Sequence, residues 1–171
     1  MKRSSPVEPT LLFVGTLYHN KEYFITVRER LKGLFGGIAI ESPDINYSHS
    51  DYYRDELGWP IIRTFIFFSN KIDPLVLPDI KLLTNSIEEE LSTCGKRNIN
   101  IDPGYMTLSK VVLASTKNYS HRIYIGKGIF AEVTLVHVKG EYQPHLFTYK
   151  DYAGTTVRNL FGEARKSLKK L

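Results

Sequence analysis

The chain has a single cysteine and no long apolar run. Cys94 on its own cannot form an internal disulfide and argues against a cysteine-based zinc site, which fits a reducing compartment. The tightest apolar clusters, at residues 11–14 and 65–68, fall far short of the roughly 18 residues that a membrane helix needs. No apolar segment follows the basic start Met1-Lys-Arg3, so a standard secretion signal is not expected. These absences predict a cytoplasmic protein without a membrane partner.

The sequence also lacks the local motifs of common catalytic and metal sites. Its five histidines show no H-x-H, H-x-x-x-H or H-E-x-x-H spacing, so no metal site is expected. It contains neither a G-x-S-x-G nucleophile elbow nor a G-x-x-x-x-G-K-S/T phosphate loop. Motifs therefore assign no catalytic residue and no cofactor.

One tetrapeptide matches part of a nucleotide-binding motif. Asn70-Lys-Ile-Asp73 agrees with the guanine-reading tetrapeptide of GTPases and follows a predicted strand. The phosphate loop that such a site requires is missing, and Asp73 directly before Pro74 is suited to cap a helix. We predict that Asp73 caps a helix and that the tetrapeptide does not read guanine.

What the sequence does contain is an ordinary globular composition with a basic excess. Its 171 residues, 42% of them hydrophobic, suffice for one domain with its own core. No repeat or linker divides residues 1–171, and only residues 1–9, with two serines and two prolines, look like a loose arm. Most of the net charge of +5 comes from residues 150–171, where there are six basic and two acidic residues.

Three amphipathic helices are expected from caps and periodicity. Asn20 caps the first, which ends at Gly36-Gly37, and Asp73 caps the second, which ends before Gly95. The third helix closes the chain. Their apolar positions step by three and four residues: Phe24, Val27, Leu31, Leu34 and Phe35, then Ile80, Leu83, Ile87 and Leu91, then Val157, Leu160, Phe161, Ala164 and Leu168.

Runs of β-branched and aromatic residues predict strands at residues 10–18, 38–47, 61–68, 105–115, 121–125 and 129–138. The string Asp102-Pro-Gly104 predicts a turn before the fourth strand. The order β-α-β-β-α-β-β-β-α is typical of an α+β domain with a mostly antiparallel sheet and helices on one face. The first six elements match the ferredoxin-like pattern, and a C-terminal β-hairpin and helix follow, which leaves the other sheet face to a ligand. The long polar connection at residues 49–60 is of a kind that often carries function.

A polar cluster is expected at the hairpin formed around Gly126-Lys-Gly128. A symmetric link places four pairs of residues opposite each other: Ile125 and Ile129, Tyr124 and Phe130, Ile123 and Ala131, and Arg122 and Glu132. The charged pair is then either a partly exposed ion pair, worth up to about 1 kcal/mol, or one wall of a pocket. The neighbouring strand and its turns supply further polar side chains: Asp102, Tyr105, Lys110, Lys117 and His121.

Arg63 interrupts an otherwise apolar strand. A buried arginine needs an anionic partner, which is either a bound phosphate or a protein carboxylate. The carboxylates considered are Asp51, Asp55 and Glu56. On the second helix, polar residues three or four apart form one edge that is either solvated or directed at the same place: Lys81, Thr84, Asn85 and Glu88.

Two functions follow from these patterns. The leading one is the binding of an anionic small molecule, bearing phosphate or carboxylate, in a polar pocket on the sheet, with any catalysis unassigned. The residues expected to bind it are Arg63, Asp102, Tyr105, Lys110, Lys117, His121, Arg122 and Glu132. The alternative is a non-enzymatic module whose basic last helix contacts nucleic acid or an acidic partner. The same cations fit a solvated helix end, so we expect weak nucleic-acid binding at most. The ligand, any cofactor and the oligomeric state stay open.

Several strings also carry a resemblance to a known family: Phe13-Val-Gly-Thr-Leu-Tyr18, Asn98-Ile-Asn-Ile-Asp-Pro-Gly-Tyr105, Thr107-Leu-Ser-Lys110 and His121-Arg-Ile-Tyr-Ile-Gly-Lys-Gly128. Over residues 11–152 the chain resembles an uncharacterised bacterial domain family whose members are often labelled GTP-binding protein. The resemblance implies a small, single-domain cytoplasmic protein of unassigned activity. It also implies that residues 102–117 and 121–132 belong to the family signature.

Overall fold

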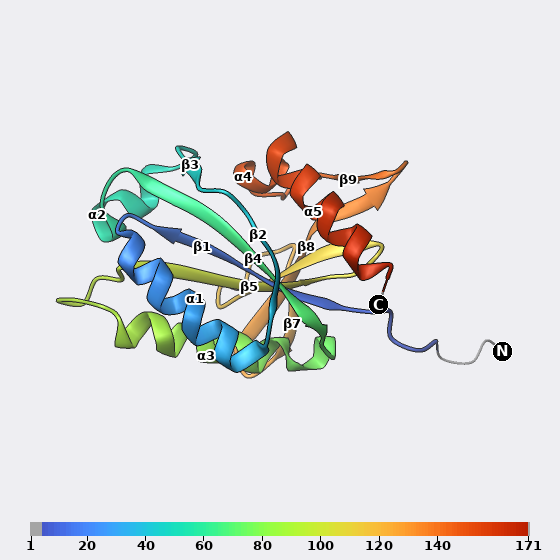
Figure 1. The fold of residues 1–171 in the computed structure, drawn as a ribbon, viewed down its shortest axis with the longest axis horizontal. Helices are drawn as coiled ribbons and strands as arrows, with labels where there is room; N and C mark the ends of the chain where they lie inside the picture. Colours follow the sequence, from blue (N-terminus) through green and yellow to red (C-terminus); the bar gives the residue numbers. More distant parts are fainter. Residues whose placement is uncertain (1–4, 171) are drawn as a thin grey trace.

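The fold is built on one antiparallel sheet. The computed structural model describes residues 5–170, and within them nine strands pair in the order β2-β4-β1-β5-β6-β8-β7, with β3 beside β4 and β9 beside β8 (Figure 1). The strands are β1 Leu11–Tyr18, β2 Ile38–Glu41, β3 Ile45–Tyr47, β4 Ile61–Lys71, β5 Ile99–Met106, β6 Lys110–Ser115, β7 Ile123–Gly126, β8 Ile129–Val138 and β9 Glu141–Gln143. Residues 5–9 belong to no strand or helix, and residues 1–4 of the expected arm lie outside the described residues.

The three expected helices are confirmed as α1 Lys21–Phe35, α3 Leu77–Glu90 and α5 Thr155–Leu168. Shorter helical segments are η1 Asp51–Tyr53, α2 Arg54–Leu57, η2 Pro74–Val76 and α4 Lys150–Ala153. Asn20 caps α1 as expected, because its side chain accepts a hydrogen bond from the amide of Glu22. Within residues 5–170, no helix is both long and apolar enough to cross a membrane.

The first half of the sheet has the expected ferredoxin-like topology. The strands β2, β4, β1 and β5 are adjacent in that order, although the chain visits them as β1, β2, β4 and β5. Helix α1 therefore connects two parallel strands that have β4 between them, and α3 connects two that have β1 between them. This arrangement of two split β-α-β units confirms the α+β fold class and the ferredoxin-like start.

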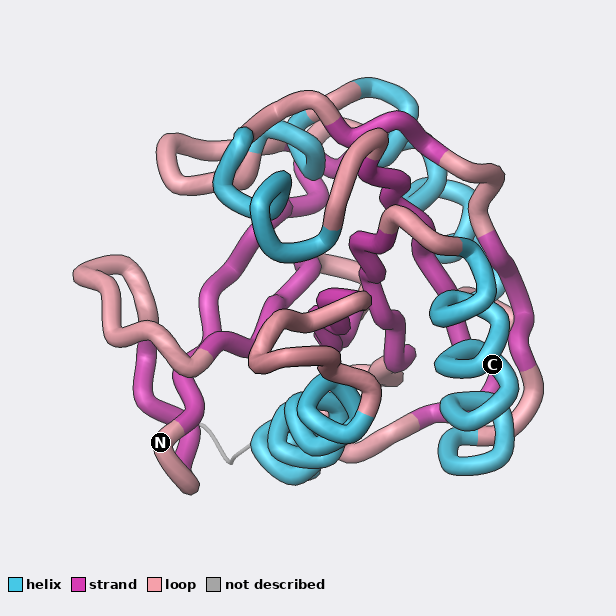
Figure 2. Tube along the Cα trace, turned by 90° about the vertical axis from the view of Figure 1, so that its left-hand side faces the viewer, coloured by secondary structure: helices cyan, strands magenta, loops and turns pink. Residues whose placement is uncertain are grey.

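Helices cover both faces of the sheet, so α5 departs from the expectation that all helices share one face. The two faces of β1 show this directly, because every one of its residues is buried. Leu12 and Val14 pack with Val27 of α1, while Leu11 and Phe13 pack with Phe161 of α5. A strand that is apolar on both sides needs a layer on each side. The strands accordingly run between helices on different sides of the sheet (Figure 2).

The predicted turn at Asp102-Pro-Gly104 is wrong, because these residues lie inside β5. Pro103 is tolerated because β6 pairs with β5 only from Gly104 onward, so one side of the strand has no partner at the proline. Gly104 is needed for close approach: a Cβ there would lie 2.4 Å from the carbonyl oxygen of Val112. The chain turns later, and the predicted strand at residues 105–115 is divided between β5 and β6.

The β7–β8 hairpin confirms two of the expected pairs and shifts a third. Tyr124 opposes Phe130 and Ile123 opposes Ala131, but Ile129 is paired with Gly126 instead of Ile125. The shift arises because residues 126–128 all have positive φ angles, which make a tight link that takes one residue out of the ladder. The predicted strand at residues 38–47 is likewise divided, into β2 and β3.

Asp73 has the predicted capping role, and its contribution can be measured. Its side chain accepts a hydrogen bond of 2.9 Å from the amide of Leu75, at the start of η2 and ahead of α3. We expect Asp73→Ala to lower the free energy of unfolding by about 1 kcal/mol and Asp73→Asn to leave it nearly unchanged, because asparagine caps equally well. Urea denaturation of both variants measures the difference. Equal losses in the two variants would contradict the capping role.

Candidate functional site

A cavity of about 670 Å³ opens where β5 and β6 separate. The two strands are paired over three residues only, beginning at Gly104 in β5 and Leu113 in β6. Beyond these residues the strand edges diverge, and the cavity is lined by Asp102 on one side and Ser115 on the other. The volume is within the range of small-molecule sites, so the gap in the sheet is the first candidate for function.

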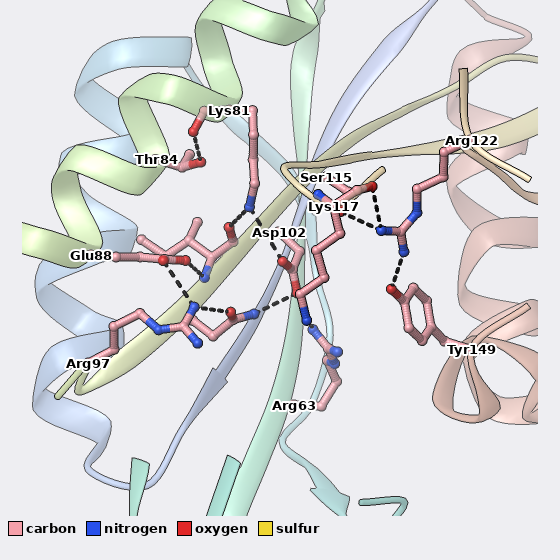
Figure 3. Close-up of polar contacts among 12 residues, drawn as sticks. Arg63, Lys81, Thr84, Glu88, Arg97, Asp102, Ser115, Lys117, Arg122 and Tyr149 are labelled. Carbon is pink, nitrogen blue, oxygen red and sulfur yellow. Dashed lines mark hydrogen bonds and ion pairs between the residues drawn. The ribbon is translucent and has the colours of Figure 1, made fainter. Parts of the chain in front are cut away.

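The open edge of β5 is completed by side chains of α3. Lys81 donates a hydrogen bond of 3.1 Å to the carbonyl of Ile101, and the carboxylate of Glu88 accepts one from the amide of the same residue (Figure 3). Thr84, on the same helix edge, is also buried and donates to the carbonyl of Lys81. Three of the four residues on the polar edge of α3 are therefore buried, and Asn85 is half-buried. Lys81 and Glu88 take the place of a neighbouring strand.

Glu88 is held in an unusual electrostatic environment. Burial raises its pKa above the ordinary value of 4.5, although the nearby Lys81 and the hydrogen bond from Ile101 act in the opposite direction. Its second oxygen accepts a hydrogen bond of 3.2 Å from Arg97. Arg97 also donates to Glu56 and Asn100, so it ties the long connection after β3 to β5.

Arg63 of β4 lies at the inner end of the cavity and is only 5% exposed. Its Nη2 is 2.7 Å from Asp151 Oδ2, without hydrogen-bond geometry, and its Nη1 is 3.7 Å from Asp102 Oδ2. Within residues 5–170, its buried Nε and Nη1 donate no hydrogen bond. Burial acts to lower the pKa of Arg63, but Asp151, Tyr152 and Asp102 outweigh it and raise the pKa, so the side chain stays charged.

The carboxylate partner of Arg63 differs from the three that were considered. Asp151 comes from α4, near the C-terminus, while Glu56 is paired with Arg97. Asp51 and Asp55 make no ion pair with Arg63 in the described part of the chain. The reason is tertiary, because the segment of Asp151 is brought over the end of β4 by the packing of α5.

Aromatic rings and one glycine fix the position of the Arg63 guanidinium. Its central carbon is 5.7 Å from the ring centres of Tyr47 and Tyr152, which allows cation–π attraction. A Cβ on Gly15 would lie 3.0 Å from both Arg63 Nη1 and the hydroxyl of Tyr152. Glycine at this position of β1 therefore leaves the room that the guanidinium occupies.

Arg122 and Glu132 form the expected pair, but the pair is buried. Arg122 Nε donates to Glu132 Oε2 at 2.6 Å, and the side chains are 1% and 2% exposed. Arg122 also donates to Ser115, to the carbonyl of Lys117 and to the hydroxyl of Tyr149. Of the two alternatives, the pair is therefore not the partly exposed one, and both residues line the cavity. His121 Nε2 lies 3.0 Å from the same Glu132 oxygen.

Two predicted site residues lie elsewhere. Lys110 and Tyr105 line a separate small pocket with Glu8 and Thr107. Lys110 begins β6, and about 17 Å of strand separates it from Ser115 at the cavity. Tyr105 packs with Leu77 on the α3 side of the sheet, because consecutive strand residues point to opposite faces. The other six predicted residues lie at the cavity, His121 through its contact with Glu132 and the remaining five in its lining.

Family membership follows from a match to residues 8–168. They fit a family described as Domain of unknown function (DUF4416). The chain belongs to this family. The comparison thereby agrees with the resemblance to an uncharacterised domain family. Neither the curated proteins nor the solved structures gave a match.

Sequence reasoning missed several cavity residues of this family member. The walls include Tyr47, Tyr53 and Tyr149, and Asp151 faces Arg63. The long connection at residues 49–60 was the available signal, and it does reach the cavity through Tyr52 and Tyr53. Among the residues that the structure describes, no group of three or more His, Cys, Asp or Glu side chains is placed to hold a metal ion. The site combines fixed cations, carboxylates and phenols.

Proposed function

We propose that the cavity binds an anionic small molecule that carries a phosphate or a carboxylate. The observation that supports this proposal most directly is the state of Arg63, whose buried Nε and Nη1 donate no hydrogen bond within the described residues. Leaving charged donors buried and unbonded is costly, and an anion that reaches them removes that cost. Asp151 balances the charge of Arg63 but does not occupy these two donors.

Lysines in the cavity wall support anion binding more than the net charge of the lining does. Six Lys and Arg residues and five Asp and Glu residues line the cavity, so the excess is a single charge. Most of these cations face carboxylates of the protein, whereas Lys117 and Lys150 have no carboxylate partner in the part of the chain described. They are available to attract an anion toward Arg63.

The alternative function, nucleic-acid contact through α5, has less in its favour. Arg158 donates to the carbonyl of Ala153 at 3.1 Å, and Arg165 donates to the carbonyl of Leu108 at 2.8 Å. Lys166 is paired with Glu163. Part of the basic stretch thus holds the fold together, and fewer cations are left for a phosphate backbone.

Calorimetric titration with inorganic phosphate, methyl phosphate and acetate tests the proposal. We expect wild-type protein to bind at least one of them and Arg63→Lys to bind it about tenfold more weakly, a loss of about 1.4 kcal/mol. Lysine keeps the charge beside Asp151 but lacks the planar fork of donors. Arg165→Lys, which makes the same exchange outside the cavity, is the control and should bind like wild type.

Circular dichroism at the assay temperature verifies that each variant is folded. Wild-type protein that binds none of the three anions would contradict the proposal. So would an Arg63→Lys variant that is folded and binds with unchanged affinity.

A further inference from the structure

The cavity walls are unusually rich in one kind of side chain. Six tyrosines line it, and the aliphatic lining residues are Leu113 and Ala114: the tyrosines are Tyr47, Tyr52, Tyr53, Tyr119, Tyr149 and Tyr152. A phosphate or carboxylate group alone fills a small part of about 670 Å³. The rest of the ligand therefore meets the other lining side chains, among which tyrosine is the most frequent residue type.

Two of these tyrosines offer hydroxyl groups to the cavity. Within residues 5–170, the hydroxyls of Tyr47 and Tyr53 make no hydrogen bond, and neither is among the fully buried unpartnered atoms. Burial is the main cause that raises the pKa of each, so both phenols stay protonated at neutral pH. Both hydroxyls are therefore neutral hydrogen-bond donors on residues that line the cavity.

Two further tyrosines stand exposed at the mouth of the cavity. Tyr52 is 64% exposed and Tyr119 is 51% exposed, and they come from the two connections that flank the opening. The ammonium of Lys117 lies 5.0 Å from the ring centre of Tyr52, and the guanidinium of Arg122 lies 4.5 Å from that of Tyr119. Exposed rings gathered at a polar opening are typical of a ligand-binding groove. Each ring keeps surface on which a planar group can stack.

We propose that the ligand is an anion attached to a flat aromatic ring, with the anionic group at Arg63 and the ring among the tyrosines of the wall and mouth. This inference rests on the proposed function and narrows its ligand class. Ring stacking supplies affinity that does not depend on which atoms the ring contains. A phosphate and a carboxylate share the required charge, so the test includes both.

Matched pairs of probes separate the ring from the anion. Calorimetry compares phenyl phosphate with methyl phosphate and benzoate with acetate, and glucose 6-phosphate serves as a non-aromatic ligand of similar bulk. We expect the aromatic member of at least one pair to bind about tenfold more tightly than its partner, equivalent to about 1.4 kcal/mol. We expect glucose 6-phosphate to bind no better than methyl phosphate.

Variants at the mouth identify the rings responsible. Tyr52→Leu and Tyr119→Leu replace exposed side chains, so both proteins should fold, and at least one should lose most of the tenfold preference while binding methyl phosphate or acetate as wild type does. Tyr124→Leu is the matched control, because Tyr124 is 60% exposed on β7 and does not line the cavity. It should keep the preference.

The outcomes separate the two proposals. Equal binding of both members of each pair would overturn the aromatic ligand class while leaving the anion site in place. Glucose 6-phosphate that binds as tightly as phenyl phosphate would do the same. If no probe binds wild-type protein, the anion site and the aromatic class both fall. A preference that survives in both Tyr52→Leu and Tyr119→Leu would contradict stacking at the mouth.

Discussion

Replacing Arg122 with methionine will lower the free energy of unfolding by about 3–5 kcal/mol, because it leaves the carboxylate of Glu132 buried without its partner. The two side chains are 1% and 2% exposed, and their contact is 2.6 Å long. The same substitution removes the hydrogen bonds to Ser115 and to the hydroxyl of Tyr149. Urea denaturation monitored by circular dichroism measures the loss.

A double variant shows whether the loss comes from the uncompensated charge. In Arg122→Met/Glu132→Leu neither charge remains buried, so we expect a large part of the stability to return. Lys127→Met is the control, because it removes an ion pair that is exposed. The side chains of Lys127 and Asp79 are 57% and 60% exposed. An exposed ion pair contributes about 1 kcal/mol at most to stability. If Arg122→Met costs no more than Lys127→Met, the Arg122–Glu132 pair behaves as a surface pair and the prediction is wrong.

The hydrogen bonds of Arg122 also define its place in the site. Its guanidinium makes four hydrogen bonds, to Glu132, Ser115, the carbonyl of Lys117 and Tyr149. An arginine has about five donors, so little capacity remains for a ligand. We therefore expect Arg122 to shape the cavity wall and Arg63 to hold the anion.

Local patterns predicted the ferredoxin-like half of the fold. The caps at Asn20 and Asp73 and the apolar spacing of α1 and α3 depend on neighbours within a few turns. They are confirmed except at Leu34, which is 48% exposed at the end of α1, and Asp73 caps η2 directly ahead of α3. The string Asp102-Pro-Gly104 failed for the opposite reason. Its residues are common in turns, but here Gly104 is needed because the carbonyl of Val112, in another strand, approaches it closely. A local sequence pattern does not predict a close approach between two strands.

The site was predictable where its residues meet through a hairpin. Arg122 and Glu132 follow from the short link between β7 and β8, so pairing alone placed them together. The partner of Arg63 could not be found in this way, because Asp151 lies in a stretch whose evident feature is positive charge. This contact between segments far apart in the chain depends on how α5 packs over the sheet. The periodicity of apolar residues does not predict that packing.

The polar edge of α3 shows why a helix pattern is ambiguous. Glu88 falls on the side of the helix that a standard reading assigns to solvent, yet it is buried against the amide of Ile101. That assignment assumes that neighbouring strands supply all the hydrogen-bond partners of each other's backbone amides and carbonyls. Once β6 has diverged from β5, the free amide needs another acceptor, and α3 supplies one.

We expect Glu88→Ala to lower the free energy of unfolding by about 2–3 kcal/mol at pH 7, because the amide of Ile101 is left buried without an acceptor and Arg97 loses one of its carboxylates. Glu88→Gln keeps one acceptor oxygen and should lose less. Hydrogen exchange should show faster opening at Ile101 in Glu88→Ala than in Glu88→Gln. Glu89→Ala, one position along α3 with an exposed side chain, should leave stability within about 0.5 kcal/mol of wild type.

The pH dependence of Glu88→Gln provides a second, independent readout. Burial raises the pKa of Glu88 in the folded protein above its ordinary value of 4.5. The protonated Glu88 side chain therefore stabilises the folded protein most at pH values below 4.5. This contribution to stability is lost as the pH rises through the pKa of the folded protein. Glutamine does not titrate. The stability of Glu88→Gln relative to wild type should therefore improve between pH 4 and pH 7, as measured by urea denaturation at each pH. A relative stability that worsens over this range would mean that the folded protein favours the ionised carboxylate, with Lys81 and Arg97 outweighing the cost of its burial.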